Sequence, residues 1–259
     1  MTHESALHQF LKKNIAPSVK RYSRLEVVGL ENLPAAGQGA MLACNHSGGL
    51  WWDAACLYAA LDHRVVSFVA HHWDAKVGLM RNVLEKLDCS FLDESLSDIS
   101  EQGSVVTGAK SGKLMCLYPE ESYHTFRHRY TLFNFSPHII KYAKIAQVPI
   151  IPVSIIGVEE AAPTLFGPKF NKVPLHVPFH FPLILPVKVT VEFGKPCLYD
   201  ELIPKLPEGL SAVPSIELTD EESFAMAARK LRQLMHDTIS KYKKCRLSDE
   251  KYIDREGWF

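Results

Sequence analysis

Short runs of apolar residues recur along the chain, separated by stretches long enough to form helices. Most of these runs are apolar at consecutive positions, which is typical of strands covered on both faces. Such runs span 25–30, 40–44, 65–70, 90–92, 114–118, 150–156 and 187–193. The stretches between them predict helices over 53–61, 76–87, 93–111 (interrupted at Gly103), 137–146 and 223–242. Strands that alternate with helices predict an α/β fold in which a mostly parallel central sheet is flanked by helices.

The alternation shows no internal repeat and no long linker, so a single domain is predicted over residues 1–259. An N-terminal helix over 5–22 and a C-terminal helix over about 220–243 are expected to flank its core. In the N-terminal segment, four apolar residues recur at helical spacing beside a basic face. This pattern fits a packing helix better than a membrane-surface helix, because Pro17 interrupts it.

The segment 173–186 reads VPLHVPFHFPLILP and differs from the rest of the chain. Prolines at this density exclude a regular helix or a central strand. The large apolar side chains between them either cover the core or form an exposed hydrophobic surface. Core cover is the commoner outcome, whereas an enzyme that acts on lipids would need the exposed surface.

The composition and the net charge limit the cellular compartment and the binding partners that we expect for this protein. Lys plus Arg and Asp plus Glu both total 29, so the net charge of zero gives no electrostatic reason to expect nucleic acid. The six cysteines form no close pair, and four lie within or beside apolar runs, which favours reduced thiols and a reducing compartment. The N-terminus lacks a signal-peptide pattern, and no window approaches the roughly 18 apolar residues of a spanning helix. Any membrane contact is therefore expected to be peripheral and on the cytoplasmic side.

One short segment, from Asn45 to Asp53, combines a base with a carboxylate. Asn45 and His46 follow a predicted buried strand, so the imidazole is expected at the carboxyl end of the sheet, where α/β sheets bind ligands. Gly48 and Gly49 allow a tight turn, and Asp53 opens a helix. A carboxylate bound to Nδ1 would fix the tautomer and leave Nε2 to take a proton from a hydroxyl group. One histidine near one aspartate is, by itself, more often structural than catalytic.

Three further segments follow in a characteristic order. Residues 89–92 form a short strand that ends at Asp93. The run Leu-Tyr-Pro-Glu ends the next strand with Glu120, and residues 148–153 read Val-Pro-Ile-Ile-Pro-Val. In order and spacing, these blocks resemble the lysophosphatidic acid acyltransferase-like family of phospholipid and glycerol acyltransferases. The resemblance covers about residues 24–196.

The resemblance implies an O-acyltransferase that moves a fatty acyl group directly from acyl-CoA or acyl-carrier protein to a hydroxyl of a glycerolipid or lysolipid. It implies His46 as general base and Asp53 as the residue that orients it, with no cofactor besides the thioester co-substrate. The residues expected to contact substrate are Asn45, Gly48, Gly49, Asp93, Glu120, Arg127 and Arg129.

The chain departs from the family pattern in three places. The family's aspartate stands five residues after the histidine, where this chain has Trp51, whereas Asp53 stands seven after it. Glu94 and Tyr123 occupy positions where the family has arginines that are thought to hold the acceptor phosphate. Losing these cations weakens phosphate binding and favours an acceptor without a phosphate. Nearby cations that could replace them, or equally be solvated surface charges, are Arg81, Lys113, Arg127 and Arg129.

Other signals are weaker. His124 and His128 lack the glutamate of a zinc-protease motif, and His176 and His180 flank Pro178, so no metal site is expected. The Gly-x-Ser-x-Gly elbow of serine hydrolases does not occur. Two alternatives to a transferase stay open, namely a non-catalytic lipid-binding protein of the same fold and an acyl-thioester hydrolase.

Overall fold

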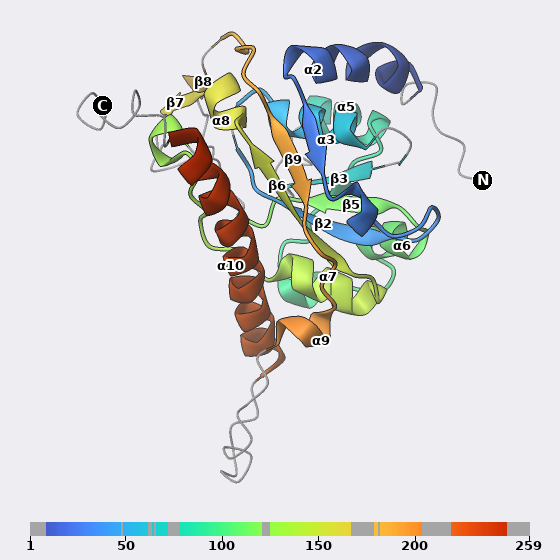
Figure 1. Ribbon diagram of the computed structural model, residues 1–259. Coiled ribbons are helices and arrows are strands. Elements are labelled where there is room, and N and C mark those ends of the chain that lie inside the picture. Colours follow the sequence, from blue (N-terminus) through green and yellow to red (C-terminus); the bar gives the residue numbers. More distant parts are fainter. Residues whose placement is uncertain are drawn as a thin grey trace.

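A seven-stranded sheet forms the centre of the protein (Figure 1). The computed structural model describes residues 9–47, 49–61, 64, 66–71, 78–120, 125–166, 179–180, 182–203 and 219–247. The strands are ordered β1-β9-β6-β2-β5-β3-β4, and all neighbouring pairs are parallel except β6 and β9. Their bounds are Glu26–Val28 (β1), Ala40–Cys44 (β2), Val66–Ala70 (β3), Ser90–Phe91 (β4), Leu114–Leu117 (β5), Ile150–Ile156 (β6) and Thr190–Phe193 (β9). The prediction of a mostly parallel sheet flanked by helices is confirmed.

The central strands separate two hydrophobic cores, because successive side chains of a strand point to opposite faces. Met41 and Ala43 of β2 contribute to one core, which α6, α7 and α10 cover. Leu42 and Cys44 contribute to the other, which α2 and α3 cover. The helices are α2 (Ala16–Tyr22), α3 (Trp52–Ala60), α6 (Ser104–Lys110), α7 (His138–Ala146) and α10 (Asp220–Leu247). Burial on both faces explains the unbroken apolar runs.

The remaining elements connect this framework. They are the π-helical turn η1 (Leu11–Ile15), the 3-10 turns η2 (Leu30–Asn32), η3 (Leu96–Asp98) and η4 (Phe126–His128), and the helices α5 (Gly78–Lys86), α8 (Val158–Ala161) and α9 (Tyr199–Leu202). Strands β7 (Thr164–Phe166) and β8 (Phe179–His180) form a separate antiparallel pair. Within the described ranges, no helix combines the length and apolarity needed to cross a membrane.

The structure corrects two details of the sequence-based elements. The helix expected over 93–111 is divided into η3 and α6, and the strand expected from 187 begins at Thr190. Pro17 lies in the first turn of α2, which follows the π-helical turn η1 without a break, so the helical stretch continues past the proline. Of the segment 173–186, residues 173–178 and 181 lie outside the described ranges.

Candidate active site

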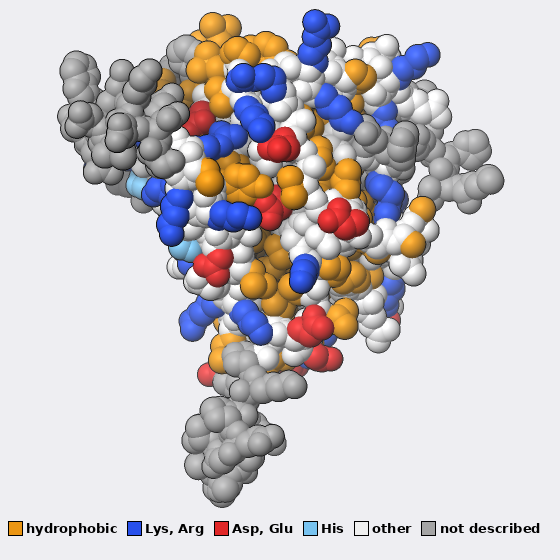
Figure 2. Space-filling model, in the orientation of Figure 1, with side chains coloured by type: hydrophobic (Ala, Val, Ile, Leu, Met, Phe, Trp, Pro, Cys, Tyr) orange, Lys and Arg blue, Asp and Glu red, His pale blue; other side chains and the backbone are white. Residues whose placement is uncertain are grey.

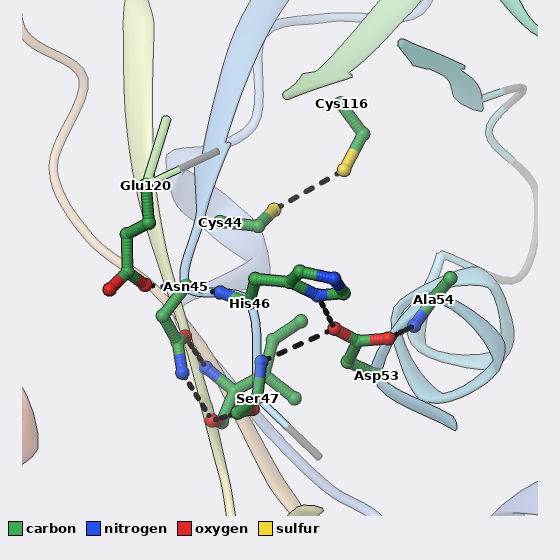
Figure 3. Close-up of polar contacts among 9 residues, drawn as sticks. Cys44, Asn45, His46, Ser47, Asp53, Ala54, Cys116 and Glu120 are labelled. Carbon is green, nitrogen blue, oxygen red and sulfur yellow. Dashed lines mark hydrogen bonds and ion pairs between the residues drawn. The ribbon is translucent and has the colours of Figure 1, made fainter. Parts of the chain in front are cut away.

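The site lies at the carboxyl ends of β2, β5 and β6, where the loops after three parallel strands meet. Asn45 follows β2 and joins it to β6 by two hydrogen bonds (Figure 3). Its Nδ2 donates to the carbonyl of Ile155 at 2.9 Å, and its Oδ1 accepts from the amide of Ile155 at 2.7 Å. A side-chain amide carries both a donor and an acceptor, so asparagine suits this position where aspartate would not. Asn45 therefore has a positional role beneath the next residue, His46.

His46 and Asp53 form a direct hydrogen bond despite their unusual spacing. The distance from His46 Nδ1 to Asp53 Oδ2 is 2.7 Å, and the Asp53 side chain is 1% exposed, against 19% for His46. Asp53 lies in the first turn of α3, where a carboxylate is stabilised by the helix dipole. Its Oδ1 accepts from the amide of Ala54 at 2.7 Å, and its Oδ2 also accepts from the amide of Ser47 at 3.3 Å. Two backbone amides, those of Ser47 and Ala54, thus hold the carboxylate toward the imidazole (Figure 3).

The electrostatics around His46 favour a base rather than a permanently neutral ring. Burial disfavours the imidazolium, but the charge of Asp53 and its hydrogen bond outweigh burial and raise the pKa of His46, with a smaller contribution from Glu120. In the neutral ring, a proton on Nδ1 is directed at Asp53, so Nε2 carries the lone pair. The ring also packs on Tyr118, with centroids 4.6 Å apart.

A tight turn absorbs the two extra residues between His46 and Asp53. The amide of Trp52 donates to the carbonyl of Gly49 at 3.2 Å, which makes Leu50 and Trp51 the central residues of a β-turn. Both have positive φ, of 58° and 54°, as in the turns that normally contain asparagine and glycine. A bulky residue in this conformation costs roughly 1–2 kcal/mol. The side chains of Leu50 and Trp51 point outward and are 46% and 65% exposed.

Glu120 supports the backbone of the site rather than facing it with a free carboxylate. It follows β5, is 6% exposed, and its Oε1 accepts from the backbone amide of His46 at 3.2 Å. Its Oε2 accepts from the backbone amide of Phe133 at 2.6 Å. The Pro-Glu pair at the end of a predicted strand marked this residue, but the two amides it binds are 74 and 13 residues away in sequence. Sequence reasoning therefore missed its positioning role.

Replacing Glu120 by alanine is expected to lower the free energy of unfolding by about 2 kcal/mol or more. The change leaves two backbone amides without their acceptor, and each unsatisfied buried donor costs about 1–3 kcal/mol. Urea unfolding followed by circular dichroism measures the difference. Glu101→Ala is the matched control, because Glu101 is 72% exposed and forms only a surface pair with Lys110. Equal stability of the two variants would contradict the assigned role.

The structure does not gather all predicted substrate-binding residues around His46. Asp93 accepts a hydrogen bond from the hydroxyl of Tyr142 at 2.8 Å and so connects β4 to α7. Arg129 stacks on Phe126, with its guanidinium carbon 4.7 Å from the ring centroid, and Arg127 is exposed on η4. These described contacts are structural, and none of them joins the His46–Asp53 pair.

Gly49, Arg81 and Lys113 each bind another group of the protein. The amide of Gly49 donates to the carbonyl of Ala162 at 2.6 Å, so in this arrangement it is not directed at the oxyanion that forms during acyl transfer. Gly48 lies outside the described residues. Arg81 pairs with Glu85 at 2.7 Å. Lys113 pairs with Asp88 at 2.6 Å and precedes β5, at the end of the sheet opposite the site. Lys113 is therefore not a replacement for the missing phosphate ligands.

The thiols near the site are poor nucleophiles. Cys44 and Cys116 are both fully buried, and their sulfur atoms lie 3.4 Å apart (Figure 3). Burial raises the pKa of Cys44 well above its ordinary value, as its apolar strand predicts. Across the described part of the chain, no group of three or more His, Cys, Asp or Glu residues could hold a metal ion. His124 and His176 lie outside that part.

Two mycobacterial proteins are similar in sequence to 68% of this chain. An uncharacterized protein of Mycobacterium leprae is 30% identical over 199 residues, which is 68% of this chain and 52% of that protein. An uncharacterized protein of Mycobacterium tuberculosis H37Rv is 30% identical over 203 residues, or 68% of this chain and 53% of that protein. The chain thus spans about half the length of these relatives.

A solved structure shares the fold. The crystal structure of the 1-acyl-sn-glycerophosphate (LPA) acyltransferase PlsC from Thermotoga maritima matches with a TM-score of 0.57, covering 94% of this chain and 84% of that chain. The sequence identity is 17%, so the match concerns the fold. The Acyltransferase family model matches residues 24–156, which include the His46–Asp53 pair, Glu120 and the whole of β6. The chain belongs to the acyltransferase family, as its motifs predict.

Proposed function

We propose that this protein transfers a fatty acyl group from an acyl thioester, either acyl-CoA or acyl-carrier protein, to a hydroxyl of a glycerolipid or lysolipid. The observation that carries the proposal is the 2.7 Å bond between His46 and a buried Asp53, at the carboxyl ends of the central strands of an acyltransferase fold. This arrangement supplies a base whose orientation is fixed, which is the requirement for activating a hydroxyl group.

In the proposed mechanism, Nε2 of His46 removes the proton from the acceptor hydroxyl while its oxygen attacks the thioester carbonyl. Asp53 stabilises the imidazolium that forms. The tetrahedral intermediate then collapses: the carbon–sulfur bond breaks, and the imidazolium returns the proton to the departing thiolate. The products are an ester and a free thiol, and no acyl-enzyme is formed. Cys44 has no part in this scheme, since its thiol is buried and its pKa is raised.

The charges near His46 favour an acceptor that lacks a phosphate monoester. Two carboxylates, Asp53 and Glu120, contact His46 directly. Glu94 stands where the family has an arginine, and Lys113 lies at the opposite end of the sheet. A dianionic phosphate is repelled by this environment. Neutral glycerides, other lysolipids and long-chain alcohols are the acceptor classes that remain.

An acceptor panel tests both the reaction and the charge argument. With labelled acyl-CoA, we expect ester formation, with lysophosphatidic acid at least about tenfold less effective than the best neutral acceptor, because each missing charged hydrogen bond is worth about 1.5–3 kcal/mol. A preference for lysophosphatidic acid would defeat the charge argument but not the reaction. Release of free fatty acid without ester would identify a hydrolase, and lipid binding without turnover of any thioester would identify a binding protein.

We also propose that the protein works at a membrane surface, on the cytoplasmic side. Its acceptors are insoluble in water, and its cysteines Cys44, Cys56 and Cys116 are buried without forming disulfides, which is consistent with a reducing compartment.

A further inference from the structure

The turn between the base and its aspartate carries two large apolar side chains on the surface. Leu50 and Trp51 occupy turn positions that favour asparagine and glycine, and both are exposed. Strained residues of this kind cluster at active sites and at segments that bind ligands. Because the turn directly joins His46 to Asp53, whatever binds these side chains lies beside the base.

The turn lies near other exposed apolar side chains, and we name this set the apolar rim. Its members share high exposure and large apolar side chains: Tyr22, Leu50, Trp51, Leu183 and Leu185, which are 44%, 46%, 65%, 63% and 39% exposed. These residues are far apart in the sequence, but hydrogen bonds and a ring contact connect the segments that carry them.

Four contacts join these segments. The ring of Tyr22 meets Trp52 edge to face, with centroids 6.1 Å apart, and its hydroxyl donates to the carbonyl of Ile184 at 2.6 Å. The amides of Leu185 and Gly49 donate to the adjacent carbonyls of Ala161 and Ala162, at 2.7 and 2.6 Å. The end of α2, the turn and the segment 182–186 therefore lie together around α8.

Basic side chains border the rim. Arg21 and Arg24 are exposed and line a surface hollow of about 620 Å³ together with Ser18, Tyr22 and Pro186. Arg24 also donates to the carbonyl of Pro186 at 2.9 Å, which fixes it beside the rim. The nearby carboxylate of Glu26 is paired with Lys188 at 2.9 Å. Figure 2 shows hydrophobic and basic side chains side by side at the top of the molecule, where Figure 1 places α2 and the loop that leads into β9.

We infer that the apolar rim docks onto an anionic phospholipid surface, with Leu50 and Trp51 entering the interface and Arg21 and Arg24 binding lipid phosphates. Tryptophan and leucine beside arginines have the composition of interfacial membrane sites. The inference deepens the proposed function, since docking through this turn places His46 at the membrane surface, where a lipid hydroxyl is presented. Binding to the phospholipid surface does not require turnover of an acyl thioester.

The decisive variant is Leu50→Asn with Trp51→Gly. It removes both apolar side chains and supplies the residues that such a turn prefers, so the fold is expected to be at least as stable. Leu198→Ser is the matched control: Leu198 is 54% exposed, and it caps α9, at the far end of the molecule from α2 (Figure 1), where serine is a favourable cap.

Binding is measured by sedimentation with vesicles of phosphatidylcholine, with and without phosphatidylglycerol. We expect the double variant to bind at least about tenfold more weakly than the wild type, and Leu198→Ser to bind as the wild type does. Arg21→Gln with Arg24→Gln is expected to remove most of the preference for phosphatidylglycerol, about fivefold for each arginine. Brominated lipids should quench tryptophan fluorescence of the wild type more than that of Trp51→Phe.

The outcomes separate this inference from the proposed reaction. Wild-type binding by the double variant, or failure of the wild type to bind either vesicle, overturns the docking inference whatever the activity. Weakened binding of the double variant supports docking even if no acceptor is acylated, in which case the proposed reaction alone fails.

Discussion

Replacement of His46 by glutamine is expected to lower the rate of ester formation by at least about 10³-fold. General base catalysis contributes about 10²–10⁴-fold, and the imidazole here also returns the proton to the departing thiolate. Glutamine retains a group that can donate to Asp53, so the loop is expected to stay folded. The measurement is the turnover of labelled acyl-CoA with the best acceptor from the panel.

The matched control for this variant is His236→Gln, because His236 lies on α10 and its side chain is 43% exposed. It should retain wild-type activity. Thermal unfolding of both variants excludes a general loss of structure. Full activity of His46→Gln would refute the assignment of the base and, with it, the mechanism.

Replacement of Asp53 by asparagine is expected to have the next largest effect, roughly 10²–10⁴-fold in kcat, because the amide no longer fixes the His46 tautomer. The pH dependence should change as well. The base acts when neutral, so the rate rises as pH increases through the pKa of His46. Burial lowers this pKa while Asp53 raises it, and the balance is a raised value. Without the carboxylate, burial dominates, and the acidic limb of the profile moves to lower pH.

The pH profile of kcat/KM for the residual activity of Asp53→Asn tests this directly. A merely structural role for Asp53, as a carboxylate at the start of α3, would lower the stability without moving the acidic limb. The asparagine retains an oxygen that can accept from Ala54, so the variant is expected to fold. An unmoved limb together with wild-type kcat would show that Asp53 does not act on His46.

Strands β2 and β6, at the centre of the sheet, were predictable from sequence with their correct bounds, and β5 ends one residue earlier than predicted. β2 and β6 are buried along their whole length, and all of their positions except Ser154 are apolar. The antiparallel direction of β9 was not predictable, because a hydrophobic run carries no information about direction. The start of α10 at Asp220 agrees with the helix expected from about 220. Thr219 and Glu222 form reciprocal side-chain to backbone hydrogen bonds there, and this Thr-x-x-Glu pattern is visible in the sequence.

The active-site residues were predictable to different degrees. Asn45 and His46 follow a buried strand, so their place at its carboxyl end followed from the pattern. The contact with Asp53 depends on the path of the intervening turn, and a spacing alone does not determine that path. Glu120 was marked by its motif, but its partners are backbone amides of remote segments, which no local pattern encodes.

The double hydrogen bond of Asn45 to β6 has a consequence for how such sites diversify. It anchors the histidine end of the loop to a central strand, while the first turn of α3 independently anchors the aspartate end. The distance between the two catalytic groups is therefore set by the scaffold and not by the number of residues that connect them. Connections of different length can therefore join these anchors. The surface that meets the lipid then changes, while the distance between His46 and Asp53 stays the same.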